Sequence, residues 1–175
     1  MPSPIDEIDQ FVIVMLENRS FDHMLGYWGL PPWSDARAAA PVDGVKLDFT
    51  CPAPDGTPCR PFEIQADTLR SDLPHSRGST WRQMARDAND TTLFRMNGFV
   101  KESSGTVAAP GQPFCMGYLT PRLIPVTHML ATEFTVCDRW FTPIPTDTHP
   151  NRMVATAGWT PYDQTHGQLV DASPT

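Results

Sequence analysis

The sequence predicts an α/β fold in which a sheet is flanked by helices. Two short apolar runs, residues 11–16 (FVIVML) and residues 134–138 (FTVCD), are rich in β-branched residues and predict buried strands. Helical patterns follow both runs, so strands and helices alternate along the chain. With 175 residues, 40% of them hydrophobic, the chain has the length of one domain and enough apolar side chains for a core.

The first two helices are expected between these strands. Ser20 is a candidate N-cap for a short helix that carries Met24 and Leu25 and stops at Gly26. A second helix is expected over residues 79–86, where no helix-breaking residue interrupts the sequence.

Two further helices are expected nearer the carboxyl end. One begins at Thr120, a candidate N-cap, or only at Pro125, because a proline inside a helix breaks it. Its apolar face is expected to hold the following side chains: Val126, Met129, Leu130 and Phe134. The last helix is expected over residues 151–158 and ends at Gly158.

Charge and composition exclude several classes of protein. The net charge of −7 argues against a nucleic-acid partner, which needs a basic face. No stretch is long enough to span a bilayer, and the first residues lack the features of a secretory signal, so a cytoplasmic location is the default expectation. Cys51 and Cys59 flank a turn-rich loop and form a candidate local disulfide if the protein is exported, whereas Cys137 is expected in the core.

Glu17 and Asn18 follow directly on the first predicted strand. In open α/β sheets, ligands bind in the crevice outside the carboxyl ends of the strands. Carboxylate and amide oxygens are hard donors that suit a divalent metal ion, so these two residues are candidate metal ligands. The alternative is that they only open the loop after the strand.

Three segments together resemble the bacterial phosphoesterase family. These segments are residues 17–26 (ENRSFDHMLG), residues 72–76 (DLPHS), and residues 131–141 (ATEFTVCDRWF) followed by residues 148–152 (THPNR). The family holds non-haemolytic phospholipases C and acid phosphatases, and it is related in fold to alkaline phosphatases and arylsulfatases. The resemblance therefore implies an alkaline-phosphatase-like sheet and a divalent metal ion, of unknown identity, held in part by Glu17 and Asn18.

The resemblance also implies roles for the last segment. By register, Thr148 falls on the family's nucleophile, and Thr146 is a weaker substitute two residues earlier. Pro150 suits the start of a helix, whose free N–H groups favour an ionised hydroxyl and a bound phosphoryl oxygen. Asn151 and Arg152 are candidate substrate-binding residues. The alternatives are that Thr148 only caps the helix and that Arg152 is an exposed surface residue.

His75 is the second candidate catalytic residue. The family carries an Asp-x-x-His element at this place, with the His near the phosphoryl site, and residues 72–75 match it. His75 is therefore expected to donate a hydrogen bond or a proton to the leaving oxygen. A histidine after a proline is otherwise an ordinary loop residue.

The remaining metal ligands of the family lie in segments that this sequence does not match. One of those segments is an Asp-Asp pair, and no Asp-Asp dipeptide occurs here. Residues 1–175 are therefore interpreted as the amino-terminal portion of one phosphoesterase catalytic domain. Two functions stay open: a metal-dependent phosphoric ester hydrolase of phospholipase C or acid phosphatase type, and a non-catalytic remnant that binds phosphate-like ligands or a complementing chain. A phosphate ester or phospholipid is the expected ligand, and self-association is expected from an uncovered sheet.

Overall fold

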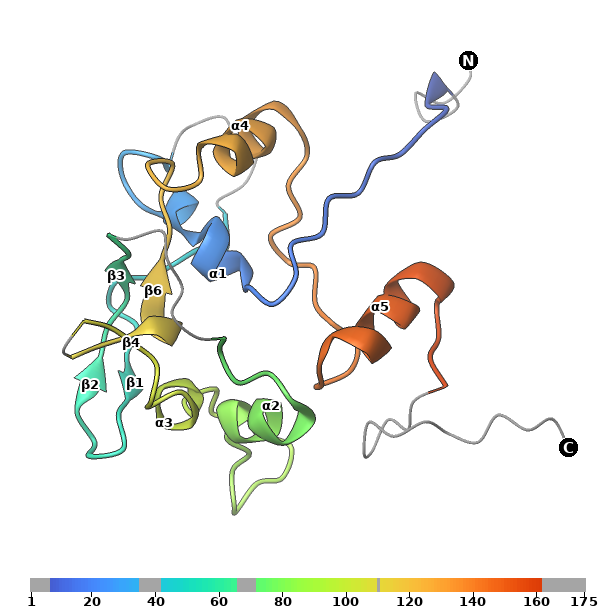
Figure 1. Ribbon diagram of the computed structural model, residues 1–175. Coiled ribbons are helices and arrows are strands. Elements are labelled where there is room, and N and C mark those ends of the chain that lie inside the picture. Colours follow the sequence, from blue (N-terminus) through green and yellow to red (C-terminus); the bar gives the residue numbers. More distant parts are fainter. Residues whose placement is uncertain (1–6, 35–41, 66–71, 110, 162–175) are drawn as a thin grey trace, which may run out of the picture.

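Helices and small two-stranded sheets make up a mixed α/β fold (Figure 1). The computed structural model describes residues 7–34, 42–65, 72–109 and 111–161. The helices in these ranges are α1 (Phe21–Met24), the 3-10 helix η2 (Gly26–Gly29), α2 (Arg77–Met84), α3 (Phe99–Glu102), the 3-10 helix η3 (Phe114–Met116), α4 (Pro125–Glu133) and α5 (Thr148–Ala157). The strands are β1 (Cys51–Pro52), β2 (Pro58–Cys59), β3 (Phe62–Glu63), β4 (Val107–Ala109), β5 (Gln112–Pro113) and β6 (Gly117–Tyr118).

Each described sheet is a single pair of short strands. Strands β1 and β2 form an antiparallel hairpin, β4 and β5 form a second one, and β3 runs parallel to β6. The parallel pair places Phe62 opposite Gly117 and joins two segments that are far apart in the sequence. The mixed α/β class was predicted, but an extensive central sheet is not part of the described residues.

Two hydrophobic clusters hold these elements together. The first is centred on Leu25, Tyr27 and Ala131, and it packs α1 and η2 against α4 (Figure 1). Within it the Tyr27 hydroxyl lies 2.7 Å from His128 Nδ1, and burial raises the pKa of Tyr27 to about 12. The second cluster, centred on Cys51, Val100 and Met116, joins β1 to α3 and η3.

The predicted strand over residues 11–16 is wrong for this structure. The segment is extended, but it forms no strand and makes no backbone hydrogen bond to another described residue. Its six side chains are exposed, with fractions from 43% for Leu16 to 87% for Val12. A strand needs a neighbour to satisfy its N–H and C=O groups, and here the segment projects as an arm away from the other elements (Figure 1).

The second predicted strand, residues 134–138, is also wrong. Phe134 instead terminates α4, and its side chain is 70% exposed. The helix before it begins at Pro125, the later of the two predicted starts. The predicted apolar face is also wrong, because Val126 is 66% exposed and the helix packs through Ala131 instead. The helical spacing of apolar residues predicted α4 correctly, but it did not show which face of the helix is buried.

Local signals predicted some helix ends correctly and missed others by two or three residues. The Ser20 hydroxyl accepts a hydrogen bond from the His23 N–H, which confirms Ser20 as the N-cap of α1. The helix expected over residues 79–86 is α2, and Ser76 caps it. Gly158 ends α5 with a φ of 77°, a left-handed conformation that glycine adopts without strain.

The structure does not contain the candidate disulfide and contradicts the prediction for Cys137. Cys51 and Cys59 are directly opposite each other in the β1–β2 hairpin, and both are free thiols. Cys137, which was expected in the core, is exposed, because the strand that would have buried it does not form. Among the described residues, no helix combines the length and apolar character needed to cross a membrane.

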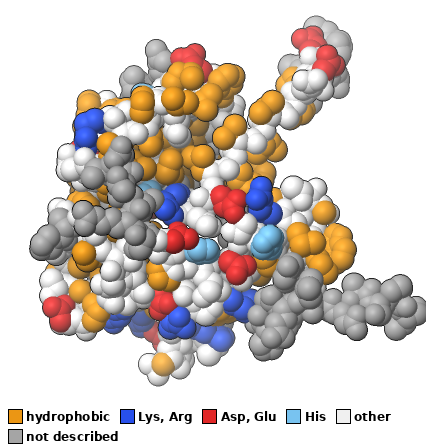
Figure 2. All heavy atoms as spheres, viewed as in Figure 1, with side chains coloured by type: hydrophobic (Ala, Val, Ile, Leu, Met, Phe, Trp, Pro, Cys, Tyr) orange, Lys and Arg blue, Asp and Glu red, His pale blue; other side chains and the backbone are white. Residues whose placement is uncertain are grey.

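The exposed arm predicts self-association of the isolated chain. Figure 2 shows hydrophobic side chains along its length. Contiguous apolar surface of this kind favours intermolecular contact. We expect the double variant Val12→Lys/Val14→Lys to be more monomeric than the unmodified chain in sedimentation-velocity experiments at several concentrations. The matched control is Val107→Lys/Val126→Lys, which changes two exposed valines elsewhere. Equal association of both double variants would show that the arm is not the cause.

His23 makes the stability of the fold depend on pH. It is 4% exposed, stacks 5.1 Å from Phe114, and its Nε2 has no partner among the described residues. Burial, aided by the nearby Arg19 cation, lowers the pKa of His23 from 6.5 to about 4. Below pH 6.5 the unfolded chain therefore binds a proton that the folded chain does not, and stability falls until the folded chain is protonated near pH 4.

We expect the His23 contribution to lower the free energy of unfolding by about 2 kcal/mol between neutral pH and about pH 5. Urea unfolding at a series of pH values measures this loss. His23→Gln, which cannot titrate, should flatten the dependence over this range, and His149→Gln, which changes an exposed histidine, should leave it unchanged. An unchanged slope in His23→Gln would contradict the assignment.

Candidate active site

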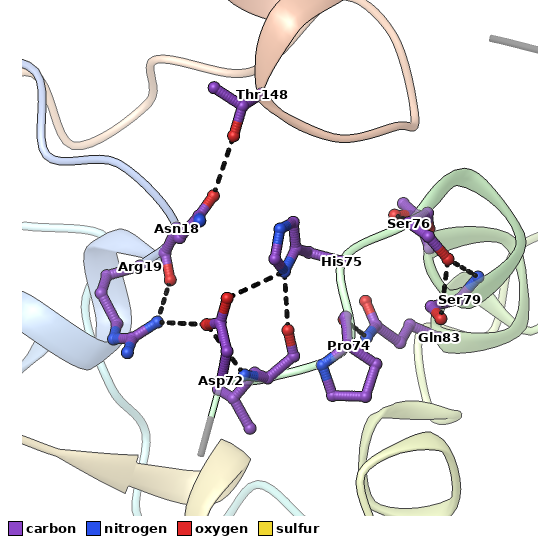
Figure 3. A network of polar contacts seen from close by, with 11 residues as sticks. Asn18, Arg19, Asp72, Pro74, His75, Ser76, Ser79, Gln83 and Thr148 are labelled. Atoms are coloured by element: carbon purple, nitrogen blue, oxygen red, sulfur yellow. Dashed lines mark hydrogen bonds and ion pairs between the residues drawn. The ribbon is translucent and has the colours of Figure 1, made fainter. Parts of the chain in front are cut away.

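The contact between Asn18 and Thr148 defines the candidate site. The Thr148 hydroxyl donates a hydrogen bond of 3.3 Å to Asn18 Oδ1, although 130 residues separate the two (Figure 3). Asn18 lies on the loop that leads into α1, and Thr148 is the first residue of α5. The fold therefore brings a candidate metal ligand and the candidate nucleophile together, but where a loop meets the start of a helix and not at the end of a predicted sheet.

The backbone at Asn18 explains how the loop presents its side chains. Asn18 has a φ of 58°, a left-handed conformation that asparagine tolerates better than most residues. This conformation turns the chain sharply between the extended arm and the N-cap of α1. The carbonyl of Asn18 accepts a hydrogen bond from the Arg19 guanidinium, which braces the turn.

The start of α5 differs from the predicted one in detail. Asp147 occupies the N-cap position and makes no side-chain capping bond, so Thr148 is the first helical residue and Pro150 the third. The hydroxyl of Thr148 therefore does not cap the helix but reaches Asn18 instead. The N–H groups of the first turn of a helix have no partner within the helix and point out of its end, beside this hydroxyl.

Asn151 fixes the loop that carries Thr148. Its side-chain amide donates to the carbonyl oxygens of Ile144, Thr146 and Asp147 at 3.0–3.1 Å. Its oxygen accepts from the Ile144 N–H at 3.2 Å. In this structure the amide of Asn151, a predicted substrate-binding residue, is thus occupied by backbone groups of residues 144–147.

Glu17 and Arg152 pair with each other beside the Asn18–Thr148 contact. Arg152 NH1 lies 3.3 Å from Glu17 Oε2, and the two side chains are 66% and 43% exposed. Arg152 is four residues after Thr148, so it lies on the same side of α5 one turn further along. The pair makes a second link between α5 and the loop at residues 17–18.

His75 lies in a braced turn beside these residues. Its Nδ1 is 2.7 Å from the Leu73 carbonyl oxygen and 3.6 Å from Asp72 Oδ2 (Figure 3). The turn, residues 72–76, lines a cavity of about 270 Å³ together with Ser79 and Asp147. Because Asp147 directly precedes Thr148, this cavity extends from the His75 turn to the start of α5.

Sequence reasoning missed two residues that the structure draws into this network. Arg19 NH1 lies 3.4 Å from Asp72 Oδ1 and so connects the loop before α1 to the His75 turn. Both residues stand inside the matched segments, but the resemblance gave them no role. The available signals were a charged residue directly after Asn18 and another three residues before His75.

The donor chemistry suits a hard cation, but the number of donors is small. Glu17 and Asn18 offer carboxylate and amide oxygens, whereas Ca²⁺ takes six to eight oxygen ligands and Mg²⁺ takes six. Among the described residues, no group of three or more His, Cys, Asp or Glu side chains is arranged to hold a metal ion. Glu17 and Asn18 thus fit part of a metal site, and the described residues do not complete it.

Comparison with known proteins identifies the family. Residues 8–175 match the Phosphoesterase family. Because the match covers nearly the whole chain, the protein belongs to this family, as its sequence motifs predicted.

Its curated relatives are phospholipases C. Non-specific phospholipase C3 of Arabidopsis thaliana is 31% identical over 86% of this chain and 29% of its own length. Phospholipase C B of Mycobacterium tuberculosis is 29% identical over 99% of this chain and 34% of its own length. Non-hemolytic phospholipase C of Burkholderia pseudomallei is 32% identical over 93% of this chain and 22% of its own length. The chain thus spans about a third or less of the length of these relatives.

Removing the Asn151 amide should loosen the loop before α5. We expect Asn151→Ala to lower the free energy of unfolding by about 1–3 kcal/mol, because several backbone groups lose their partner together. Amide hydrogen exchange at residues 144–147 should accelerate in the same variant. The control Asn89→Ala removes an exposed amide and should change stability by less than about 0.5 kcal/mol. Unchanged exchange in Asn151→Ala would contradict this role.

Proposed function

We propose that the protein is a phosphoric ester hydrolase that uses Thr148 as its nucleophile. The main observation behind this proposal is the hydrogen bond between the Thr148 hydroxyl and Asn18. The two residues are 130 positions apart in the sequence, and the fold brings them together. Membership of the Phosphoesterase family supports the reaction class, and the names of the relatives favour phospholipid head-group esters or similar phosphoesters as substrates.

In the proposed first step, Thr148 Oγ attacks phosphorus. The new bond joins this oxygen to phosphorus, the bond to the leaving oxygen breaks, and a phosphothreonine forms. The hydroxyl proton passes to a solvent water, while Asn18 Oδ1 only orients the hydroxyl by accepting its hydrogen bond. A doubly protonated His75 donates the proton on its Nε2 to the leaving oxygen. Water then attacks phosphorus, the bond to Thr148 breaks, and Thr148 regains a proton as phosphate or a phosphomonoester departs.

The chain's own groups supply part of the positive field that this step needs. The N–H groups at the start of α5 would hold a phosphoryl oxygen, and the Arg152 guanidinium lies one turn away. Asn151 acts by holding the loop in place. A divalent metal ion, held in part by Glu17 and Asn18, would when bound favour the ionised hydroxyl and stabilise charge on the phosphoryl group.

The test compares two threonines on one loop. The chain is assayed with p-nitrophenyl phosphate and with phosphatidylcholine, each with added Mg²⁺, Ca²⁺, Mn²⁺ or Zn²⁺. We expect slow, metal-dependent turnover, because few ligands and a net charge of −7 leave the site short of positive charge. Thr148→Ala should reduce turnover to the background rate, and Thr146→Ala should retain most of it.

Turnover that survives in Thr148→Ala would overturn the proposed nucleophile. The second candidate function, binding of phosphate-like ligands without turnover, is favoured by the small number of metal donors among the described residues. Calorimetry with inorganic phosphate separates the two functions. If the chain binds phosphate but shows no turnover with each of the four metal ions, the result would support binding without turnover.

A further inference from the structure

The turn that carries His75 is held by groups that the proposed reaction does not use. Asp72 Oδ1 accepts hydrogen bonds from the Leu73 N–H at 3.0 Å and lies 3.4 Å from Arg19 NH1. On the opposite side, the Pro74 carbonyl accepts a hydrogen bond from the Gln83 side chain of α2. The turn is therefore fixed between the loop before α1 and the helix α2 (Figure 3).

These contacts decide which nitrogen of His75 carries its proton. Nδ1 lies 2.7 Å from the Leu73 carbonyl oxygen, and a carbonyl oxygen only accepts hydrogen bonds. Asp72 Oδ2, 3.6 Å from the same nitrogen, places negative charge beside it. Nδ1 must therefore donate, so a neutral His75 holds its lone pair on Nε2.

The free nitrogen is turned toward the candidate site. Nε2 has no hydrogen-bond partner among the described residues, and Figure 3 shows the ring extending from the Asp72 turn toward the space beside Asn18 and Thr148. A ring with Nδ1 protonated offers Nε2 alone for proton exchange with a ligand. In the Nε2–H tautomer, Nδ1 would carry no proton and the 2.7 Å hydrogen bond to the Leu73 carbonyl oxygen would be lost.

We propose that Arg19 and Asp72 are positioning residues that hold His75 in the Nδ1–H tautomer with Nε2 facing the site. Asp72 does so by closing the turn and by its charge, and Arg19 does so by anchoring Asp72. Arg19 also donates to the Asn18 carbonyl, so one guanidinium sets the His75 turn and the candidate metal-ligand loop relative to each other. The value of this arrangement for catalysis rests on the proposed function, whereas the tautomer itself does not.

The Arg19–Asp72 ion pair is only partly buried, so it is expected to contribute little to the stability of the fold. The side chain of Asp72 is 55% exposed and that of Arg19 is 17% exposed. Ion pairs in which one partner is more than half exposed to solvent contribute little to the stability of a fold. The pair therefore serves orientation, and its loss is expected to change the His75 ring far more than the unfolding transition.

The experiment reads the tautomer directly. Long-range ¹H–¹⁵N correlation spectra of the ¹⁵N-labelled 175-residue chain are recorded without metal or substrate at about pH 9, well above the ordinary pKa of an imidazole. The signals of His75 are assigned by their absence in His75→Gln. We expect the unmodified chain to show the Nδ1–H tautomer of His75.

The variants then test the two positioning residues. Asp72→Ala should lower the ratio of Nδ1–H to Nε2–H by about threefold or more, the change expected when one net hydrogen bond is lost. Arg19→Gln should shift the ratio in the same direction. Asp72→Asn keeps an oxygen for the Leu73 N–H, so it should preserve the turn and give an intermediate ratio. Arg139→Gln, which breaks a more exposed arginine–aspartate pair with Asp43, should leave the ratio unchanged.

An Nε2–H tautomer in the unmodified chain would overturn the proposal. An unchanged ratio in both Asp72→Asn and Arg19→Gln, each with an unaltered far-ultraviolet circular dichroism spectrum, would also overturn it. Absence of phosphoesterase turnover has no bearing on these spectra. Failure of the proposed function and failure of this inference are therefore separate results.

Discussion

The candidate site depends on two polar contacts that join α5 to the loop before α1. Thr148 donates to Asn18, and Arg152 pairs with Glu17 one helical turn further along. Figure 1 shows α5 set apart from the other helices, so the relative position of the candidate nucleophile and the candidate metal ligands follows from these contacts. A single hydrogen bond contributes about 0.5–1.5 kcal/mol and an exposed ion pair contributes about 1 kcal/mol or less.

Contacts with energies of this size favour the observed position of α5 relative to the loop before α1, but other positions cost little more free energy. Burying one large apolar side chain contributes about 1.5–3 kcal/mol, and two clusters of such side chains stabilise the rest of the described fold. A ligand that bridges Asn18 and Thr148 would add to the weak contacts and stabilise the arrangement by mass action. The site is thus the part of the molecule whose geometry is most sensitive to what binds there, in contrast to the well-packed region around Tyr27 and Leu25.

The candidate site holds more cationic groups than the net charge of the whole chain would suggest. The protein carries a net charge of −7, yet the candidate site gathers Arg19, Arg152, His75 and a helix N-terminus. Each arginine is paired with a carboxylate, so the local field is nearly balanced in the ligand-free protein. Release of Arg152 from Glu17 would free a cation for a phosphoryl group and a carboxylate for a metal ion at the same time.

The sequence by itself determined the family, some of the helix ends and the segments from which the candidate site is built. Capping by Ser20, termination at Gly158 and the late start at Pro125 depend on residues close in sequence, so local chemistry was sufficient. The strands were predicted wrongly, because an apolar run becomes a strand only when a neighbouring segment accepts its hydrogen bonds and covers its side chains. Only the tertiary structure decided that residues 11–16 form an exposed arm, that Asn18 meets Thr148, and that Arg19 reaches the Asp72–His75 turn. These relations join residues up to 130 positions apart, and no local pattern specifies which distant groups will face each other.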